Sequence, residues 1–196
     1  MEEIKQVLSL FDTVEKWNSY IELSNMREAL VNELKTRLFK ELYNIGTKEL
    51  KDSGWCFDDN NNINVIRINP EGTKHIGIAV EFCWWNYNWG HRGAFIWINE
   101  PLVDITFLKQ KILQYRTELP LQDYEENNQH GWLPYVKKIP ARVFDVSDEV
   151  ISPEMCLFRA INNSKELAED MWKNVYEPFA SKHIANIMKS FITSVP

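Results

Sequence analysis

The sequence contains few cysteines, and their spacing supports neither a disulfide framework nor a thiolate metal site. Only three occur in 196 residues, Cys56, Cys83 and Cys156, and no two of them form a CxxC pair. An odd number of widely separated cysteines is typical of reduced thiols in a reducing compartment. We therefore expect a cytoplasmic protein.

Long hydrophobic runs are also missing from the chain. The sequence starts with the acidic segment MEEIKQ, and no uninterrupted apolar stretch of membrane-spanning length follows. These features predict neither a signal peptide nor a transmembrane helix, so we expect no membrane association. The net charge of −6 argues against broad, non-specific binding to nucleic acid, because neutralising phosphates requires a basic surface. A local basic patch remains compatible with this charge.

Motifs of known catalytic and cofactor sites are absent as well. Neither GxxxxGK[ST] nor GxGxxG occurs, which disfavours a phosphate-cradling loop. The four histidines, His75, His91, His130 and His183, show no metal-ligand spacing, and no HExxH is present. The sequence therefore predicts no metal and no cofactor, and it leans against an enzyme without excluding one.

The hydrophobic pattern that is present predicts a single α+β domain over residues 1–196. Apolar residues at helical spacing alternate with shorter runs at strand spacing. Helices are expected at 13–23, 24–45, 101–120 and from 164 onward, and strands at 54–57, 63–68 and 75–99, with one or two edge strands in 122–153. The first two helices are either one bent helix or two, Gly46 is expected to end the second, and Pro178 to kink or split the last. This pattern predicts an antiparallel sheet of about four to six strands, packed by N-terminal and C-terminal helices.

The stretch from 75 to 99 carries much of the aromatic content of the chain. Four of the eight tryptophans, Trp84, Trp85, Trp89 and Trp97, fall within it. Two apolar runs flank a turn-like segment, which predicts the paired strands of an antiparallel hairpin. Apolar residues occupy both faces of each run, so we expect both sides of this hairpin to be partly covered, as in a central strand pair.

Glu81 is the acidic residue within the first run of the hairpin. A carboxylate buried among apolar residues needs a partner, and a raised pKa marks a candidate general acid or base. With a neighbouring His, Glu81 is thus a candidate catalytic residue. The alternative is that Glu81 reaches solvent or forms an ion pair with Arg92 across the hairpin, an arrangement that is commoner in sheets.

The turn of the hairpin combines aromatic rings with a guanidinium group. Tyr87, Trp89, His91 and Arg92 offer flat stacking surfaces and hydrogen-bond donors, which suit bases, sugars or a peptide partner. They are the predicted binding residues. The alternative is a turn whose aromatic side chains fold back over the sheet as part of its packing.

Four segments of the chain share features with a known family: WNSYIEL at 17–23, GWCF at 54–57, GIAVEFCWW at 77–85 and DMWKNVYEPF at 170–179. Together they resemble a region that follows the nuclease core in some bacterial and phage proteins of the PD-(D/E)xK nuclease superfamily. The nuclease site itself needs two acids for a divalent metal and a Lys beside the attacking water. Glu81 has no Lys two residues later, and the apparent match at 33–35 lies on an expected helix. The resemblance therefore implies the accessory part without the catalytic part.

Together these observations predict a non-catalytic binding or accessory domain, associated through the resemblance with phage or mobile-element defence. An aromatic surface around the hairpin is the expected contact for a protein or nucleic-acid partner. The competing hypothesis is an enzyme that uses Glu81 and a neighbouring His as acid and base. A pocket containing both residues favours the enzyme, and a flat exposed aromatic patch favours the binding domain.

Overall fold

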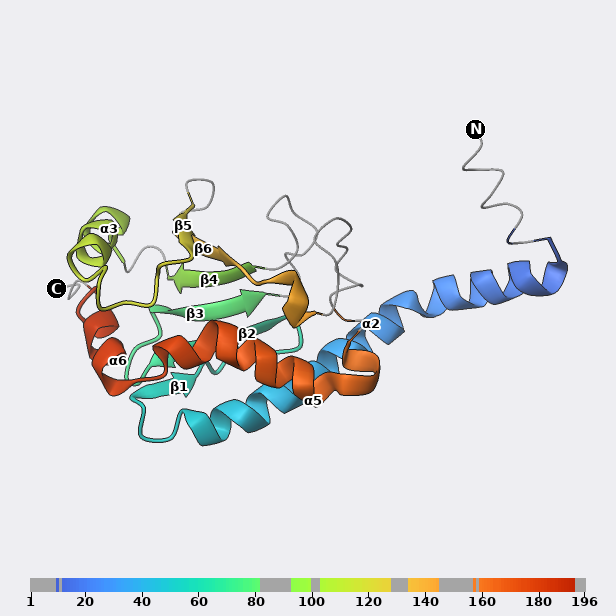
Figure 1. Cartoon of the computed structure of the whole chain (residues 1–196), viewed down its shortest axis with the longest axis horizontal. Helices are drawn as coiled ribbons and strands as arrows, with labels where there is room; N and C mark the ends of the chain where they lie inside the picture. The colour runs from blue at the N-terminus through green and yellow to red at the C-terminus, as the bar shows by residue number, and fades with distance from the viewer. Residues whose placement is uncertain are drawn as a thin grey trace. The chain divides into compact units, whose positions relative to one another are not determined.

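The computed structural model describes residues 10, 12–81, 93–99, 103–127, 134–144, 157 and 159–192 of the chain (Figure 1). The chain divides into two compact units, residues 1–33 and 34–196. The long helix α2 (Val14–Glu49) begins in the first unit and ends in the second. The sheet and the other described helices lie in the second unit, so the α+β architecture belongs to residues 34–196.

Six antiparallel strands form one sheet in the order β1-β2-β3-β4-β6-β5. They are β1 (Trp55–Phe57), β2 (Val65–Pro70), β3 (Ile76–Glu81), β4 (Gly93–Ile98), β5 (Tyr124–Glu126) and β6 (Tyr135–Lys138). The first four follow one another as a meander, with the predicted hairpin pair β3 and β4 at its centre. The prediction of an α+β fold with four to six antiparallel strands is confirmed, and β5 and β6 are the strands expected in 122–153.

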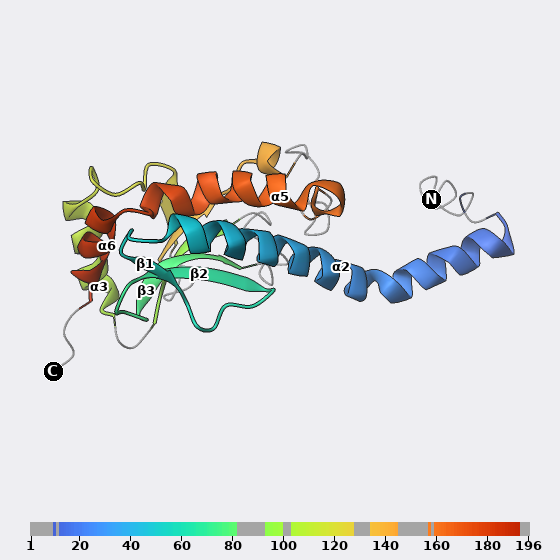
Figure 2. The same cartoon turned by 90° about the horizontal axis from the view of Figure 1, so that it is seen from below.

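One face of the sheet is covered by helices, and we call it the helix-covered face. The strand register places apolar residues side by side across it: Phe57, Ile68, Ile78 and Ile96. Figure 2 shows α5 (Ala160–Met171) and the C-terminal part of α2 on this side of the strands. Ile68 and Ile78 have no exposed surface, so the helices exclude water from the middle of the sheet.

Helix α2 is one continuous helix, so the segments 13–23 and 24–45 form one helix rather than two. The predicted end at Gly46 is wrong, since the helix continues to Glu49. Gly46 is buried, and a Cβ atom there would overlap the rings of Phe57 and Trp172. The missing side chain therefore serves the close packing of helix against sheet rather than helix termination.

The C-terminal segment forms a broken helix over the same face of the sheet. Helix α5 begins at Ala160, before the predicted cap Ser164, but the backbone of Asn163 is non-helical, with φ −131° and ψ 45°, so the helix is kinked directly before Ser164. The helix continues into a π-helical turn, η3 (Trp172–Tyr176), and a 3-10 turn, η4 (Glu177–Phe179). Pro178 has no backbone donor, which ends the helix, and α6 (Lys182–Lys189) starts as a separate helix. The predicted split at Pro178 is confirmed.

The second face of the sheet carries a cluster of apolar residues beside a cation. Ala79, Phe95, Trp97 and Val136 form a buried hydrophobic group on three adjacent strands. The guanidinium carbon of Arg67 lies 4.9 Å from the centre of the Trp97 ring, which is a cation–π geometry. Both faces of the central strands are therefore at least partly buried, as predicted for the central hairpin.

Leu38 and Leu30 lie on the same helix in different environments, since Leu38 has no exposed surface and Leu30 is 52% exposed. We expect Leu38→Ala to lower the free energy of unfolding by about 2 to 5 kcal/mol, because it removes buried methyl groups and leaves a cavity. Leu30→Ala should change this free energy by no more than about 0.5 kcal/mol. Urea denaturation of both variants measures the difference, and equal losses would contradict the exposure of Leu30.

Gly46→Ala tests whether packing or helix propensity dominates at this position. In a helix interior Ala is more favourable than Gly by about 1 kcal/mol, whereas overpacking a core costs about 1 to 3 kcal/mol. The overlap involves two rings, Phe57 and Trp172. We therefore expect a net loss of stability and a lower melting temperature, with Lys48→Ala on the exposed side of the same helix as the control. A raised melting temperature in Gly46→Ala would show that the rings move aside at little cost.

Candidate functional site

The predicted binding residues of the hairpin turn, Tyr87, Trp89, His91 and Arg92, lie outside the described residues. The binding surface around the hairpin thus stays a prediction. Glu81 is the last residue of β3, and its backbone pairs with Val65, while its side chain lies outside what the structure describes.

The described histidine next to this strand in sequence is far from Glu81. His75 precedes β3 by one residue. Because a strand rises about 3.3 Å per residue, the two Cα atoms are about 20 Å apart. His183, on α6, lies 2.9 Å from a carboxylate oxygen of Glu118 through its Nε2 atom. These two histidines therefore give no support to the hypothesis that Glu81 acts with a neighbouring His as acid and base.

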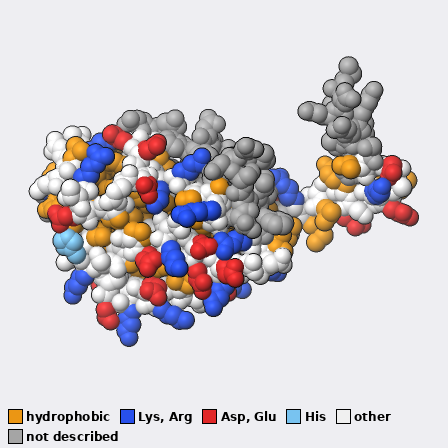
Figure 3. All heavy atoms as spheres, viewed as in Figure 1, with side chains coloured by type: hydrophobic (Ala, Val, Ile, Leu, Met, Phe, Trp, Pro, Cys, Tyr) orange, Lys and Arg blue, Asp and Glu red, His pale blue; other side chains and the backbone are white. Residues whose placement is uncertain are grey.

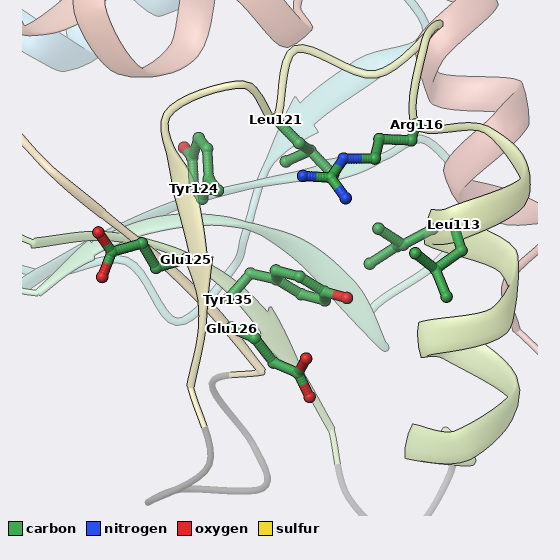
Figure 4. Close-up of a pocket in the computed structure, with 8 residues that line it drawn as sticks. Leu113, Arg116, Leu121, Tyr124, Glu125, Glu126 and Tyr135 are labelled. Carbon is green, nitrogen blue, oxygen red and sulfur yellow. The ribbon is translucent and has the colours of Figure 1, made fainter.

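A pocket lies between helix α3 (Ile105–Gln114) and the strands β5 and β6, and it has a volume of about 310 Å³ (Figure 4). Its lining combines aliphatic, aromatic and charged residues: Ile112, Leu113, Arg116, Leu121, Tyr124, Glu125, Glu126 and Tyr135. This volume is at the lower end of the range for small-molecule sites. The pocket is therefore the candidate functional site of the described chain.

Local sequence fixes the helical wall of the pocket. The Asp104 carboxylate accepts hydrogen bonds from the backbone N–H groups of Thr106 and Phe107, at 2.8 and 3.1 Å, and so caps the N-terminus of α3. After the helix, the N–H of Leu121 donates to the carbonyl oxygen of Leu119 at 2.8 Å, which turns the chain back toward β5. The helix and the edge strand thus form two sides of one cavity.

The strand wall comes from the pairing of β5 with β6. Glu126 pairs with Tyr135, and the N–H of Asn127 donates to the carbonyl oxygen of Pro134 at 2.8 Å. Because side chains alternate along a strand, Tyr124 and Glu126 share one side of β5 with the partner residue Tyr135. This side faces α3, so the pairing places a phenol and a carboxylate in the pocket wall.

The charged groups of the pocket differ in whether they are paired. The Nζ atom of Lys109 on α3 forms an ion pair with a carboxylate oxygen of Glu126. Arg116 is exposed, and within the described ranges its guanidinium forms no ion pair or hydrogen bond. Figure 4 shows Arg116 and Tyr135 pointing toward a common space, whereas Glu125 points to the other side of β5. The guanidinium is therefore the charge of the pocket that is available to a ligand.

The tyrosines of the pocket are protonated at neutral pH, and burial raises the pKa of each further. Burial raises the pKa of Tyr135, Glu126 adds to this rise, and Arg116 opposes it. Burial also raises the pKa of Tyr124, with a smaller contribution from Asp123. A neutral phenol carries a hydroxyl proton, so Tyr135 can donate a hydrogen bond to a ligand at neutral pH.

The described lining of the pocket consists of aliphatic, aromatic and charged side chains. None of the described lining residues is a His, Cys or Ser, and no cluster of three metal-ligating side chains exists among the described residues. Cys56 on β1 is a free thiol, and burial raises its pKa, followed by the nearby carboxylates of Glu71, Asp59 and Asp58. A protonated thiol is a poor nucleophile.

The N-terminal part of α2 presents a second feature, an exposed series of large apolar side chains. Residues 12–30 are all exposed, and the apolar residues among them include Val14, Trp17, Tyr20, Ile21, Leu23, Met26 and Leu30. Figure 3 shows hydrophobic side chains at the surface of this segment beside charged ones. None of the helices in the described ranges has both the length and the apolar composition needed to span a membrane.

Sequence reasoning missed the pocket. Arg116 lies within the helix expected up to Pro120, whereas α3 ends at Gln114. Glu126 and Tyr135 lie in the stretch 122–153, for which the pattern predicts only edge strands. The available signal is the pair of tyrosines, Tyr124 and Tyr135, on two short strands beside an amphipathic helix. Neither spacing nor motif indicates that Arg116 approaches them.

No family model matches the chain, and neither the curated proteins nor the solved structures contain a match. The resemblance to the region after the PD-(D/E)xK nuclease core therefore remains a prediction from the four sequence segments.

The ionisation of Tyr135 provides a test of the pocket electrostatics. We expect its pKa to lie above the ordinary value of about 10, to fall in Glu126→Gln and to rise further in Arg116→Gln. The folded state holds this proton more tightly than the unfolded chain, so the stabilising contribution is present below pH of about 10 and is lost as the pH rises through the folded pKa. NMR titration of ring-labelled tyrosine measures it, with Arg142→Gln as a control. Identical titration in all four proteins would contradict the arrangement of charges.

Proposed function

We propose that this chain is a non-catalytic binding or accessory domain, and that the pocket between α3, β5 and β6 holds a small ligand. The observation that carries the proposal is the convergence of Arg116 and Tyr135 on a cavity lined in part by aliphatic side chains. Donors beside an apolar wall orient a ligand, and the carboxylate of Glu126 is held in an ion pair with Lys109 rather than left free to act as a general base.

In the accessory role, the domain would serve a larger assembly in phage or mobile-element defence. This part of the proposal rests on the resemblance to the region after a PD-(D/E)xK nuclease core. Tyr87, Trp89, His91 and Arg92 would then contact a protein or nucleic-acid partner. The three separated cysteines support a reducing, cytoplasmic location.

An enzyme that uses Glu81 as acid or base is the alternative function. It is favoured by the acidic residue at the end of a central strand, β3, beside the predicted aromatic turn. A substrate turned over by the native chain and not by Glu81→Gln would support the enzyme and contradict the non-catalytic proposal.

Amide NMR with a library of small neutral and charged fragments tests the binding proposal. We expect the bound fragments to shift the resonances of Leu113, Arg116 and Tyr135 and to remain chemically unchanged. Leu113→Trp should abolish these shifts, because Leu113 lines the pocket and is 63% exposed, so a larger ring fills the cavity without disturbing the core. The matched control is Gln114→Trp, on the next residue of the same helix, which does not line the pocket.

Two outcomes would contradict the binding proposal. Fragments that bind equally well to native protein and Leu113→Trp would occupy another part of the molecule. Conversion of a bound fragment into a product would show that the pocket is catalytic.

A further inference from the structure

The charges around the pocket define which ligand it accepts, and this inference rests on the proposed binding function. Two cations, Arg116 and Lys109, and two carboxylates, Glu125 and Glu126, surround the cavity or pair with its lining. Lys109 and Glu126 neutralise each other. Glu125 points to the far side of β5 in Figure 4. The guanidinium of Arg116 is left facing the cavity.

Two of the polar groups that face the cavity, Arg116 and Tyr135, are donors, and the Glu126 carboxylate beside them is held in the ion pair with Lys109. A guanidinium has five N–H donors and no acceptor, and a protonated phenol donates one hydrogen bond. Tyr135 forms no hydrogen bond through its hydroxyl to any other described residue, so this donor is available together with Arg116. Two convergent donors, one of them charged, match an oxyanion better than a neutral amide or a cation.

The remaining wall of the cavity is apolar. Ile112 and Leu121 are buried behind it, the ring of Tyr124 forms one side, and Leu113 lies at its exposed rim. A ligand gains free energy by removing this apolar surface from water. The ligand therefore carries an apolar body next to its anionic group, and the volume of about 310 Å³ limits it to a small molecule.

The charges of the pocket also limit the number of negative charges on the ligand. Arg116 is the one unpaired cation among the described lining residues, so a second negative charge on the ligand would have no second unpaired cation there to balance it. We propose that the pocket binds a small amphipathic monoanion, a carboxylate with an aliphatic or aromatic body, with its oxygens on Arg116 and Tyr135.

Four probes that share a six-carbon chain test the proposal by NMR titration: hexanoate, 1-hexanol, hexylamine and hexyl phosphate. We expect hexanoate to bind at the resonances of Leu113 and Tyr135, with 1-hexanol at least about tenfold weaker, because a charge-assisted bidentate contact is lost. Hexylamine should be the weakest of the four. Hexyl phosphate, a dianion near neutral pH, should bind less tightly than hexanoate.

Variants separate charge recognition from simple apolar binding. Arg116→Gln should weaken hexanoate by about tenfold or more and leave 1-hexanol unchanged, and Arg116→Lys should restore part of the loss, since Lys keeps the charge without the bidentate fork. Tyr135→Phe should weaken hexanoate by a smaller factor. Arg142→Gln, an exposed arginine outside this pocket, is the matched control.

The outcomes distinguish this inference from the proposed function. Equal affinity for hexanoate and 1-hexanol in native protein and in Arg116→Gln would overturn the anion inference while the binding function stands. Tighter binding of hexyl phosphate than of hexanoate would overturn the limit to one negative charge. If no probe binds while neutral fragments occupy the pocket, the anion inference fails alone, and if nothing occupies the pocket, both fail.

Discussion

The fold depends on how the C-terminal segment is fixed to the helix-covered face of the sheet. The Tyr176 hydroxyl is buried and donates a hydrogen bond of 3.0 Å to the carbonyl oxygen of Ile66. Farther along the same segment, the carbonyl oxygen of Ser181 accepts a hydrogen bond of 3.2 Å from the indole N–H of Trp55. An unpaired polar group in this position costs about 1 to 3 kcal/mol. The two bonds therefore select one placement of the segment over β1 and β2.

The pocket depends on that placement. The ring of Phe179, at the end of η4, contacts the ring of Tyr124 edge to face with centroids 5.9 Å apart. Phe191, beyond α6, lies 6.0 Å from the ring of Tyr115 at the end of α3. The helical wall and the strand wall of the pocket thus both rest on the C-terminal segment. A site held by buried rings on two sides keeps its walls in place before a ligand arrives, which lowers the ordering cost of binding.

The sequence predicts the elements better than the site, for a physical reason. Apolar periodicity follows directly from burying one face of a helix or strand, so the meander, the antiparallel sheet and the final helix break are predictable from local sequence. The role of Gly46 is not predictable in this way, because it depends on two distant residues, Phe57 and Trp172. The pocket is similar, since Arg116 and Tyr135 approach each other only through the return of the chain into β5 and its pairing with β6. No spacing along the chain encodes that approach.

The overall negative charge of the protein affects the rate at which a ligand associates, whereas the proposed anion site affects the rate at which it dissociates. The net charge is −6, but at physiological ionic strength charges farther away than a Debye length of about 8 Å are largely screened. A guanidinium and a phenol act at hydrogen-bond distances of about 3 Å, where screening is small. Distant charge mainly changes the rate of encounter, whereas close contacts change the rate of dissociation. An acidic surface therefore slows the arrival of an anion, and Arg116 and Tyr135 prolong its stay, so selectivity among amphipathic ligands resides in dissociation.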